Sequence, residues 1–215
     1  YTSVINGAGT TDIFDISDVA NSAPLLGSFT SGSAPHSNWP TADGNYLEVA
    51  RETNGGDVKI WYISNPVNVT LAATLDPTAL GIDATSPHNP VIDGNLLYVS
   101  WYEAGVQVFD ISDPNNPSVV GSYDTFPGGA EYMDGAWGVY PLLGTDRVLV
   151  SDIQTGLYVL SVNSGGGVNP GAHSVTVAEN QAVQGVLFGN HLAGVGPVVD
   201  VYVADFSIGN YGCPP

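Results

Sequence analysis

Short runs in which apolar and polar residues alternate fill this chain, and several of these runs resemble one another. Residues 96–117 read LLYVSWYEAGVQVFDISDPNNP, and residues 1–24 contain the same FDISD core. Weaker copies occupy residues 46–66 and 148–162. Alternation with a period of two predicts strands with one buried face, and no segment shows the three-to-four-residue spacing of an amphipathic helix. The pattern therefore predicts an all-β protein built from internal repeats.

The repeats are spaced almost evenly. The aspartate of FDIS, or the residue in its place, falls at Asp15, Tyr62, Asp110 and about Ser161, so the period is about 50 residues. Repeats of this length that are made of strands are typical of a β-propeller, in which each blade is a four-stranded antiparallel sheet. The repetition also means that residues shared between copies are expected to be structural.

Turn residues support the same period. Asp43-Gly44, Asp93-Gly94 and Gly189-Asn190 each separate two apolar runs, as does the looser Gly144-Thr145-Asp146. Such pairs supply the positive φ angles that a two-residue hairpin requires. We therefore expect hairpins at these positions, each joining the two innermost strands of a blade.

The hairpins and repeats together predict the strands. We expect about four blades plus partial blades at the ends, and the chain could be part of a larger propeller. The first copy lacks an innermost strand, and the last shows no clear outermost strand. The expected strands are 36–42, 46–51, 57–63 and 69–75; 88–92, 96–102, 105–112 and 118–123; 136–143, 147–152, 156–162 and 172–178; and 183–188, 191–195 and 199–206.

The segment GVQVFDISDPNNPSVVGSYDT resembles the LVIVD repeat of secreted and surface proteins of bacteria and archaea, and TDIFDISDVANSAPLLGSF resembles it as well. This resemblance implies a β-propeller and a location at or beyond the cell surface, but no definite activity. We expect one domain over residues 1–215. It would comprise LVIVD-like repeats at 1–162, a divergent last blade at 163–206 and a tail at 207–215.

The composition excludes some classes of binding partner. The chain has 21 acidic and only 3 basic residues, a formal charge of −18, yet 43% of its residues are hydrophobic. A folded, acidic protein with so few cations is not expected to bind nucleic acid or an anionic membrane. No apolar run is long enough to span a bilayer. Few basic residues, one cysteine (Cys213) and the sequon Asn68-Val69-Thr70 suggest a secreted protein.

Polar and aromatic residues at the starts of innermost strands and the ends of the next strands should meet on one rim of the propeller. His36 and His88 each follow a proline at equivalent positions of two repeats, and Trp137 takes that place in the next one. The rim candidates for ligand binding are His36, Arg51, Glu52, His88, Trp101, Tyr102, Glu131, Trp137 and Asp152.

Two imidazoles and a carboxylate such as Glu131 are a chemically reasonable zinc site. We nevertheless favour a structural or polar lining without a bound metal, because a Pro-His pair in two repeats can arise from the repeat itself. No cofactor is expected. Asp110, Asp113, Asn115 and Asn116 are oxygen-rich, but we expect their side chains to bond their own turn. Weak binding of a divalent cation such as calcium to the acidic surface stays open.

The sequence contains none of the common catalytic motifs: no nucleophile elbow, no HExxH helix and no phosphate-binding glycine loop. The leading hypothesis is therefore a non-enzymatic extracellular propeller that acts in structure, adhesion or assembly, with protein partners or copies of itself at open blade edges. One alternative is a secreted enzyme with a rim site around His36 and His88. Another is a glycan-binding module that uses Trp39, Trp61, Trp101 and Trp137.

Overall fold

The computed structural model describes residues 2–4, 9–18, 20–126, 133–143, 147–162 and 168–175. These residues form four antiparallel sheets, each of which follows chain order from one edge to the other. We call the sheets blades one to four. Their strands are β1 (Thr2–Val4), β2 (Thr10–Phe14) and β3 (Leu25–Thr30); β4 (Pro35–Pro40), β5 (Tyr46–Arg51), β6 (Val58–Tyr62) and β7 (Thr70–Leu75); β8 (Pro90–Asp93), β9 (Leu96–Ser100), β10 (Val106–Asp110) and β11 (Ser118–Tyr123); and β12 (Ala136–Tyr140), β13 (Arg147–Asp152), β14 (Gly156–Val162) and β15 (Val168–Val175).

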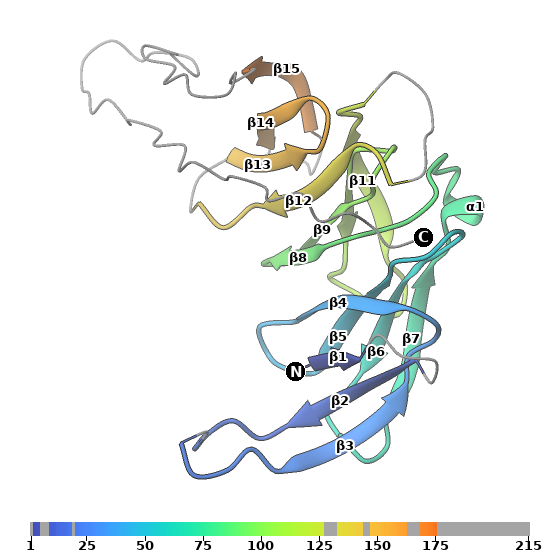
Figure 1. The fold of residues 1–215 in the computed structure, drawn as a ribbon, viewed down its shortest axis with the longest axis vertical. Helices are drawn as coiled ribbons and strands as arrows, with labels where there is room; N and C mark the ends of the chain where they lie inside the picture. Colours follow the sequence, from blue (N-terminus) through green and yellow to red (C-terminus); the bar gives the residue numbers. More distant parts are fainter. Residues whose placement is uncertain are drawn as a thin grey trace, which may run out of the picture.

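The blades follow one another along a curve, with β4, β8 and β12 on its inner side (Figure 1). β4 lies against β8, and β8 lies against β12. Innermost strands that meet around an axis, with the later strands of each sheet pointing outward, are the arrangement of a β-propeller. The predicted fold class is therefore confirmed for the described residues.

Most predicted strands lie within two residues of the observed ones. The Asp43-Gly44 and Asp93-Gly94 hairpins are confirmed, and the φ angles of Gly44 and Gly94 are 71° and 59°, in the left-handed region that glycine favours. β15 differs most, because it starts at residue 168 rather than 172. Its pairing with β14 is irregular between Val159 and Ser161, and alternation of residue types does not reveal such a bulge.

Two predicted features lie outside the described residues: the last blade, with its Gly189-Asn190 hairpin, and the turn at 144–146. Blade one has three strands among the described residues, and its strand β1 pairs with β2 and lies against β4. The predicted absence of an innermost strand from this first copy thus agrees with the described part of the chain.

A short helix interrupts the segment 76–87, for which the sequence indicated only a loop. The helix α1 (Pro77–Leu80) is a single turn, and the side chain of Asp76 caps it by accepting a hydrogen bond from the Ala79 amide. Gly81 ends it in the left-handed conformation at φ 70°. One turn is too short to produce a helical pattern of apolar residues.

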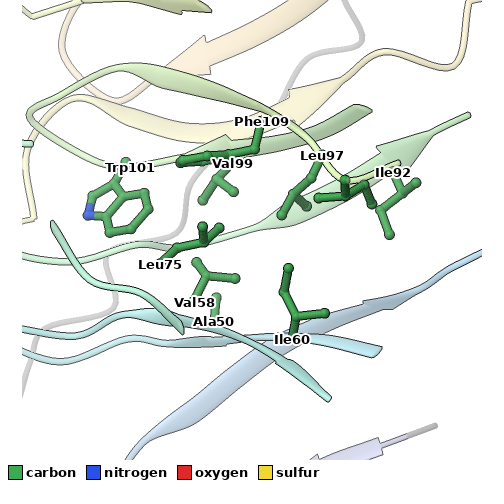
Figure 2. Packing of buried hydrophobic residues seen from close by; sticks show 10 residues of the cluster. Ala50, Val58, Ile60, Leu75, Ile92, Leu97, Val99, Trp101 and Phe109 are labelled. Atoms are coloured by element: carbon green, nitrogen blue, oxygen red, sulfur yellow. The ribbon is translucent and has the colours of Figure 1, made fainter. Parts of the chain in front are cut away.

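The largest group of buried side chains lies between blades two and three (Figure 2). Ala50, Val58 and Ile60 of blade two face Val99 and Phe109 of blade three, and all five are fully buried. Full burial of an aliphatic or aromatic side chain of this size contributes about 1.5–3 kcal/mol. The packing of one sheet face on the next therefore holds neighbouring blades at a fixed angle.

One acidic side chain is buried within blade two. Glu48 of β5 is 0% exposed, lies opposite Trp39 and Ile60, and neither of its carboxylate oxygens has a hydrogen-bond partner. Burial raises the pKa of Glu48 to about 8. The side chain is therefore largely neutral near pH 7, which avoids the high cost of an unpaired buried charge.

We expect Glu48 to make the protein less stable as the pH rises. The folded chain keeps this proton up to about pH 8, whereas the unfolded chain loses it near pH 4.3. The free energy of unfolding therefore falls between these two values. Glu48→Gln should remove this part of the dependence and raise stability at about pH 8 by more than about 1 kcal/mol. Urea denaturation at about pH 5 and about pH 8 measures the free energy of unfolding of wild type and variant. Asp113→Asn, at an exposed carboxyl group, is the control. Parallel stability–pH curves for wild type and Glu48→Gln would contradict the assignment.

Candidate functional site

Three consecutive blades present one residue each at the same place, just where the innermost strand begins. His36 sits in β4 between the paired residues Pro35 and Ser37, and Trp137 sits in β12 between Ala136 and Gly138. Both positions are β-bulges, which turn a side chain away from the regular strand direction. His88 lies directly before β8, where its amide donates to the Ser100 carbonyl. All three residues therefore lie near the start of an innermost strand.

Hydrogen bonds tie these positions across the blades. The hydroxyl of Ser37 in blade two donates to the carbonyl of His88 in blade three. In the same way, the hydroxyl of Ser100 in blade three donates to the carbonyl of Trp137 in blade four at 2.7 Å. Both bonds use only the backbone carbonyls of His88 and Trp137, so these bonds do not depend on which side chain stands there.

Glu52 is the centre of the candidate site. It follows β5, and its carboxylate Oε1 accepts a hydrogen bond from the Tyr102 hydroxyl at 2.5 Å. Oε2 lies 3.0 Å from His36 Nδ1, and Oε1 lies 3.6 Å from His88 Nε2. The side chain of Glu52 is only 16% exposed. One carboxylate therefore joins a tyrosine and two histidines from two blades in a poorly solvated place, where electrostatic interactions are strengthened.

The hydrogen bonds of His88 select its tautomer. Nδ1 lies 2.6 Å from the carbonyl oxygen of Trp137, which can only accept, and 2.7 Å from the side-chain amide nitrogen of Asn89; the carbonyl contact, the shorter of the two, favours the tautomer with the proton on Nδ1. The lone pair is then on Nε2, the nitrogen that faces Glu52. Burial lowers the pKa of His88, and the hydrogen bond to Trp137 and the charge of Glu52 oppose this effect only in part. A buried, neutral imidazole thus offers its lone pair to the site.

His36 is the more accessible of the two histidines, with a side chain 30% exposed against 5% for His88. The two rings stack, with centroids 4.7 Å apart and planes inclined by 26°. His36 Nδ1 is buried and makes no hydrogen bond of good geometry, although Glu52 Oε2 is near. Buried polar atoms are almost always satisfied, so this nitrogen is an atom that a ligand could engage.

Backbone strain accompanies the site. Tyr102 has a φ angle of 29°, which is unusual for a residue with a side chain. The carbonyl of Tyr102 accepts the Ala136 amide at 2.9 Å, and a Cβ on Gly135 would lie 2.4 Å from this carbonyl oxygen. Only glycine permits this approach of blade four. Strained residues of this kind often lie at functional sites. Here the strained residue, Tyr102, is the one whose hydroxyl donates to Glu52.

An aromatic surface borders the polar cluster. Trp137 is 52% exposed, and its ring meets His88 edge-on at a centroid distance of 5.1 Å. An exposed indole beside buried polar groups suits the apolar face of a sugar-like ligand. Five of the predicted rim residues are therefore brought together: His36, Glu52, His88, Tyr102 and Trp137.

The other predicted rim residues lie elsewhere or outside the described part. Arg51 pairs with Asp57 at 2.5 Å, and Trp101 is fully buried in the core between blades two and three. Asp152 is buried and accepts hydrogen bonds from Thr125 and from two backbone amides of the following turn. These three residues stabilise the fold rather than line the cluster. Glu131 lies outside the described residues.

The aspartates considered for calcium bond their own turns, as predicted. Asp110 accepts the Ser112 amide at 2.8 Å, and Asp113 accepts the Asn115 amide at 3.1 Å. The first of these bonds is the main cause that lowers the pKa of Asp110. Asp15 makes the same bond to Ser17 in the first repeat. The repeated aspartate therefore serves as a turn residue.

A larger cleft, of about 480 Å³, lies apart from the cluster, between the end of α1 and blade three. Glu103 lies in its wall, but its two carboxylate oxygens already accept hydrogen bonds from Thr85 and from the Met133 amide. The carboxylate of Glu103 is therefore already satisfied within the wall of the cleft. This cleft could not be predicted from the sequence, because its lining combines the end of α1 with residues of β10 and β11.

Comparison with known proteins agrees with the repeat and the fold. Residues 89–125 match the LVIVD repeat family. The match covers blade three, from just before β8 to just beyond β11, and includes the FDIS segment. No curated protein matches the sequence.

Several solved structures share the fold. The periplasmic gluconolactonase PpgL of Pseudomonas aeruginosa is 17% identical with a TM-score of 0.61, over 79% of this chain and 49% of its own. A putative 6-phosphogluconolactonase from Bacteroides fragilis is 13% identical with a TM-score of 0.63, over 80% and 52%. A functionally unknown protein from Desulfotomaculum acetoxidans is 22% identical with a TM-score of 0.51, over 75% and 50%. The chain thus spans about half the length of these proteins, and the likeness shows the fold alone. No helix within the described residues could cross a membrane.

We expect His88 to remain neutral at pH 7 with its proton on Nδ1, because burial disfavours the charged ring and the Trp137 carbonyl requires a donor. Two-dimensional ¹⁵N NMR of the imidazoles distinguishes the two ring nitrogens, and His88→Gln assigns the signal. Since the folded pKa is lowered, this histidine should cost stability as the pH falls below about 6.5. A proton on Nε2, or a charged ring at pH 7, would overturn the assigned tautomer.

Proposed function

We propose that the chain forms part of an extracytoplasmic β-propeller that binds and hydrolyses a small, polyhydroxylated cyclic ester at the rim cluster. The observation that carries this proposal is the meeting of Glu52 with His36, His88 and Tyr102 beside the exposed ring of Trp137. A carboxylate close to two imidazoles is the usual equipment for activating water. The exposed indole next to it supports a sugar-like substrate.

The reaction needs no further reactant than water. Its oxygen forms a bond to the carbonyl carbon of the cyclic ester, and the bond between that carbon and the ring oxygen breaks. The proton that leaves the water passes through the imidazole–carboxylate cluster to the ring oxygen, so the product is an open-chain hydroxy acid. Such general acid–base catalysis by a positioned side chain accelerates a reaction about 10²–10⁴-fold.

Two further arguments support the substrate class and the location. Structural relatives are named gluconolactonase and putative 6-phosphogluconolactonase, which makes sugar lactones the first compounds to test. Three basic residues and a formal charge of −18 disfavour a phosphorylated substrate, so we propose an uncharged lactone. An LVIVD repeat, a composition poor in lysine and arginine, and one relative named as periplasmic support a place outside the cytoplasm.

A role in assembly or adhesion is the second candidate, and one observation favours it. Blade one has three described strands, and unpaired strand edges attract further strands. Strands from outside the segment, from the same polypeptide or from another subunit, would complete the blade. This role concerns the edge of the propeller and the hydrolytic role concerns its rim, so one protein can have both.

We expect the 215-residue chain to hydrolyse glucono-δ-lactone faster than buffer does at neutral pH. Glu52→Gln should lower kcat/KM by about 100-fold or more, because the cluster loses the carboxylate that joins its members. Trp137→Ala should act mainly by raising KM, since the indole only provides a surface for the sugar. Acid release measured at constant pH reports the rate.

Glu103→Gln is the matched control for Glu52→Gln. Glu103 also follows the second strand of its blade and is buried, but its hydrogen bonds lie outside the cluster. Thermal melting of each variant confirms that it is folded. If wild type does not exceed the buffer rate, or if Glu52→Gln and Glu103→Gln slow the reaction equally, the hydrolytic proposal fails.

A further inference from the structure

We propose that His36, Glu52 and His88 bind a divalent transition-metal ion, with zinc as the first ion to test. This inference rests on the proposed water-activating role of the same cluster and specifies the group that would activate the water. The sequence favoured a polar lining without a bound metal, and the proposal departs from that preference on the geometry of the three side chains.

The ligand atoms are at suitable separations. One donor atom from each residue can be chosen so that all lie within 4.8 Å of one another. Zinc binds imidazole nitrogen and carboxylate oxygen at about 2.0–2.2 Å, so neighbouring ligand atoms in a tetrahedral site lie about 3.4 Å apart. The observed separations from the Glu52 oxygens, 3.0 Å to His36 Nδ1 and 3.6 Å to His88 Nε2, bracket this value.

The chemistry of the donors points to a transition metal. Two imidazoles with one carboxylate suit zinc and its neighbours, whereas calcium and magnesium prefer oxygen ligands. Three protein ligands leave a fourth position open for water, as in catalytic rather than structural zinc sites. Bound zinc lowers the pKa of such a water to about 7, which is the chemistry that hydrolysis of an ester requires.

The groups around the three ligands also fit. Histidines that bind metals usually donate their other ring N–H to a carbonyl or carboxylate, and His88 Nδ1 does so to the Trp137 carbonyl. The hydroxyl of Tyr102 holds Glu52 in place in the corresponding way. The second ring nitrogen of His88, Nε2, lies on the side of Glu52, 3.6 Å from its Oε1.

The unsatisfied nitrogen of His36 is the remaining observation. Its buried Nδ1 lies 3.0 Å from a carboxylate oxygen without making a good hydrogen bond. Two atoms that approach closely without bonding each other are arranged as two ligands of a common ion would be. In a simple structural ion pair, the N–H would instead point along the line to the oxygen.

The test measures metal binding directly and without substrate. The full chain, dialysed against chelator, is titrated with Zn²⁺ in a calorimeter and with Co²⁺ while its visible absorption is recorded. We expect one tight site per chain and the intense absorption of cobalt in a four-coordinate nitrogen–oxygen site. Ca²⁺ in excess should not displace either ion.

Variants separate this site from the acidic surface. His36→Gln and Glu52→Gln should abolish the tight site and the cobalt spectrum, and Tyr102→Phe should weaken zinc binding about 10–100-fold, as loss of a supporting hydrogen bond does. Glu103→Gln should bind as wild type. His36 is partly exposed, so its variant is expected to fold, and thermal melting checks this. Zinc should raise the melting temperature of wild type but not of His36→Gln.

The outcomes also separate the metal from the proposed function. No tight site in wild type, or equal zinc binding by wild type, His36→Gln and Glu52→Gln, overturns the metal site. Lactone hydrolysis that persists in chelator would then leave the proposed function in a metal-free form. Conversely, a tight site that His36→Gln removes, in a protein that hydrolyses no lactone, confirms the metal and rejects the hydrolytic role.

Discussion

Each sheet of this protein has two faces that must be kept from water, and only the neighbouring sheets can cover them. Fully buried residues such as Ile60 and Phe109 fill the space between blades two and three because of this requirement. The same requirement brings the innermost strands β4, β8 and β12 together. The rim cluster exists because the starts of these strands lie close together, so that their side chains can meet.

Two glutamates of blade two show how environment decides the state of one residue type. Glu48 has no partner, so burial raises its pKa and keeps it neutral. Glu52, four residues later, is reached by the Tyr102 hydroxyl and by two imidazoles. Burying the carboxyl group of Glu48 is unfavourable, and its own protonation reduces this cost. The carboxylate of Glu52 instead organises polar groups from two blades.

Much of this could be predicted from residue types alone. Asp-Gly pairs need positive φ angles, so the Asp43-Gly44 and Asp93-Gly94 hairpins located their strands, and equal spacing placed His36, His88 and Trp137 together. The pairing of Glu52 with Tyr102 could not be predicted, because it depends on the positive φ of Tyr102 and on the close approach of Gly135. Trp101 entered the core rather than the rim for the same reason: the chain turns sharply between it and Tyr102. The unpartnered carboxyl of Glu48 had a visible signal, an acidic residue at an inward position of the strand YLEVAR, which the repeat pattern obscured.

At the start of an innermost strand, the main chain and the side chain of the same residue have different roles. The main chain of His88 and Trp137 supplies the carbonyl that neighbouring blades use to hold each other, and this works for any side chain. Duplication of a blade therefore copies a position at which mutation can explore new chemistry with little penalty in folding. A histidine in two blades and a tryptophan in the third illustrate how a repetitive fold can carry an asymmetric site that differs in one residue per blade.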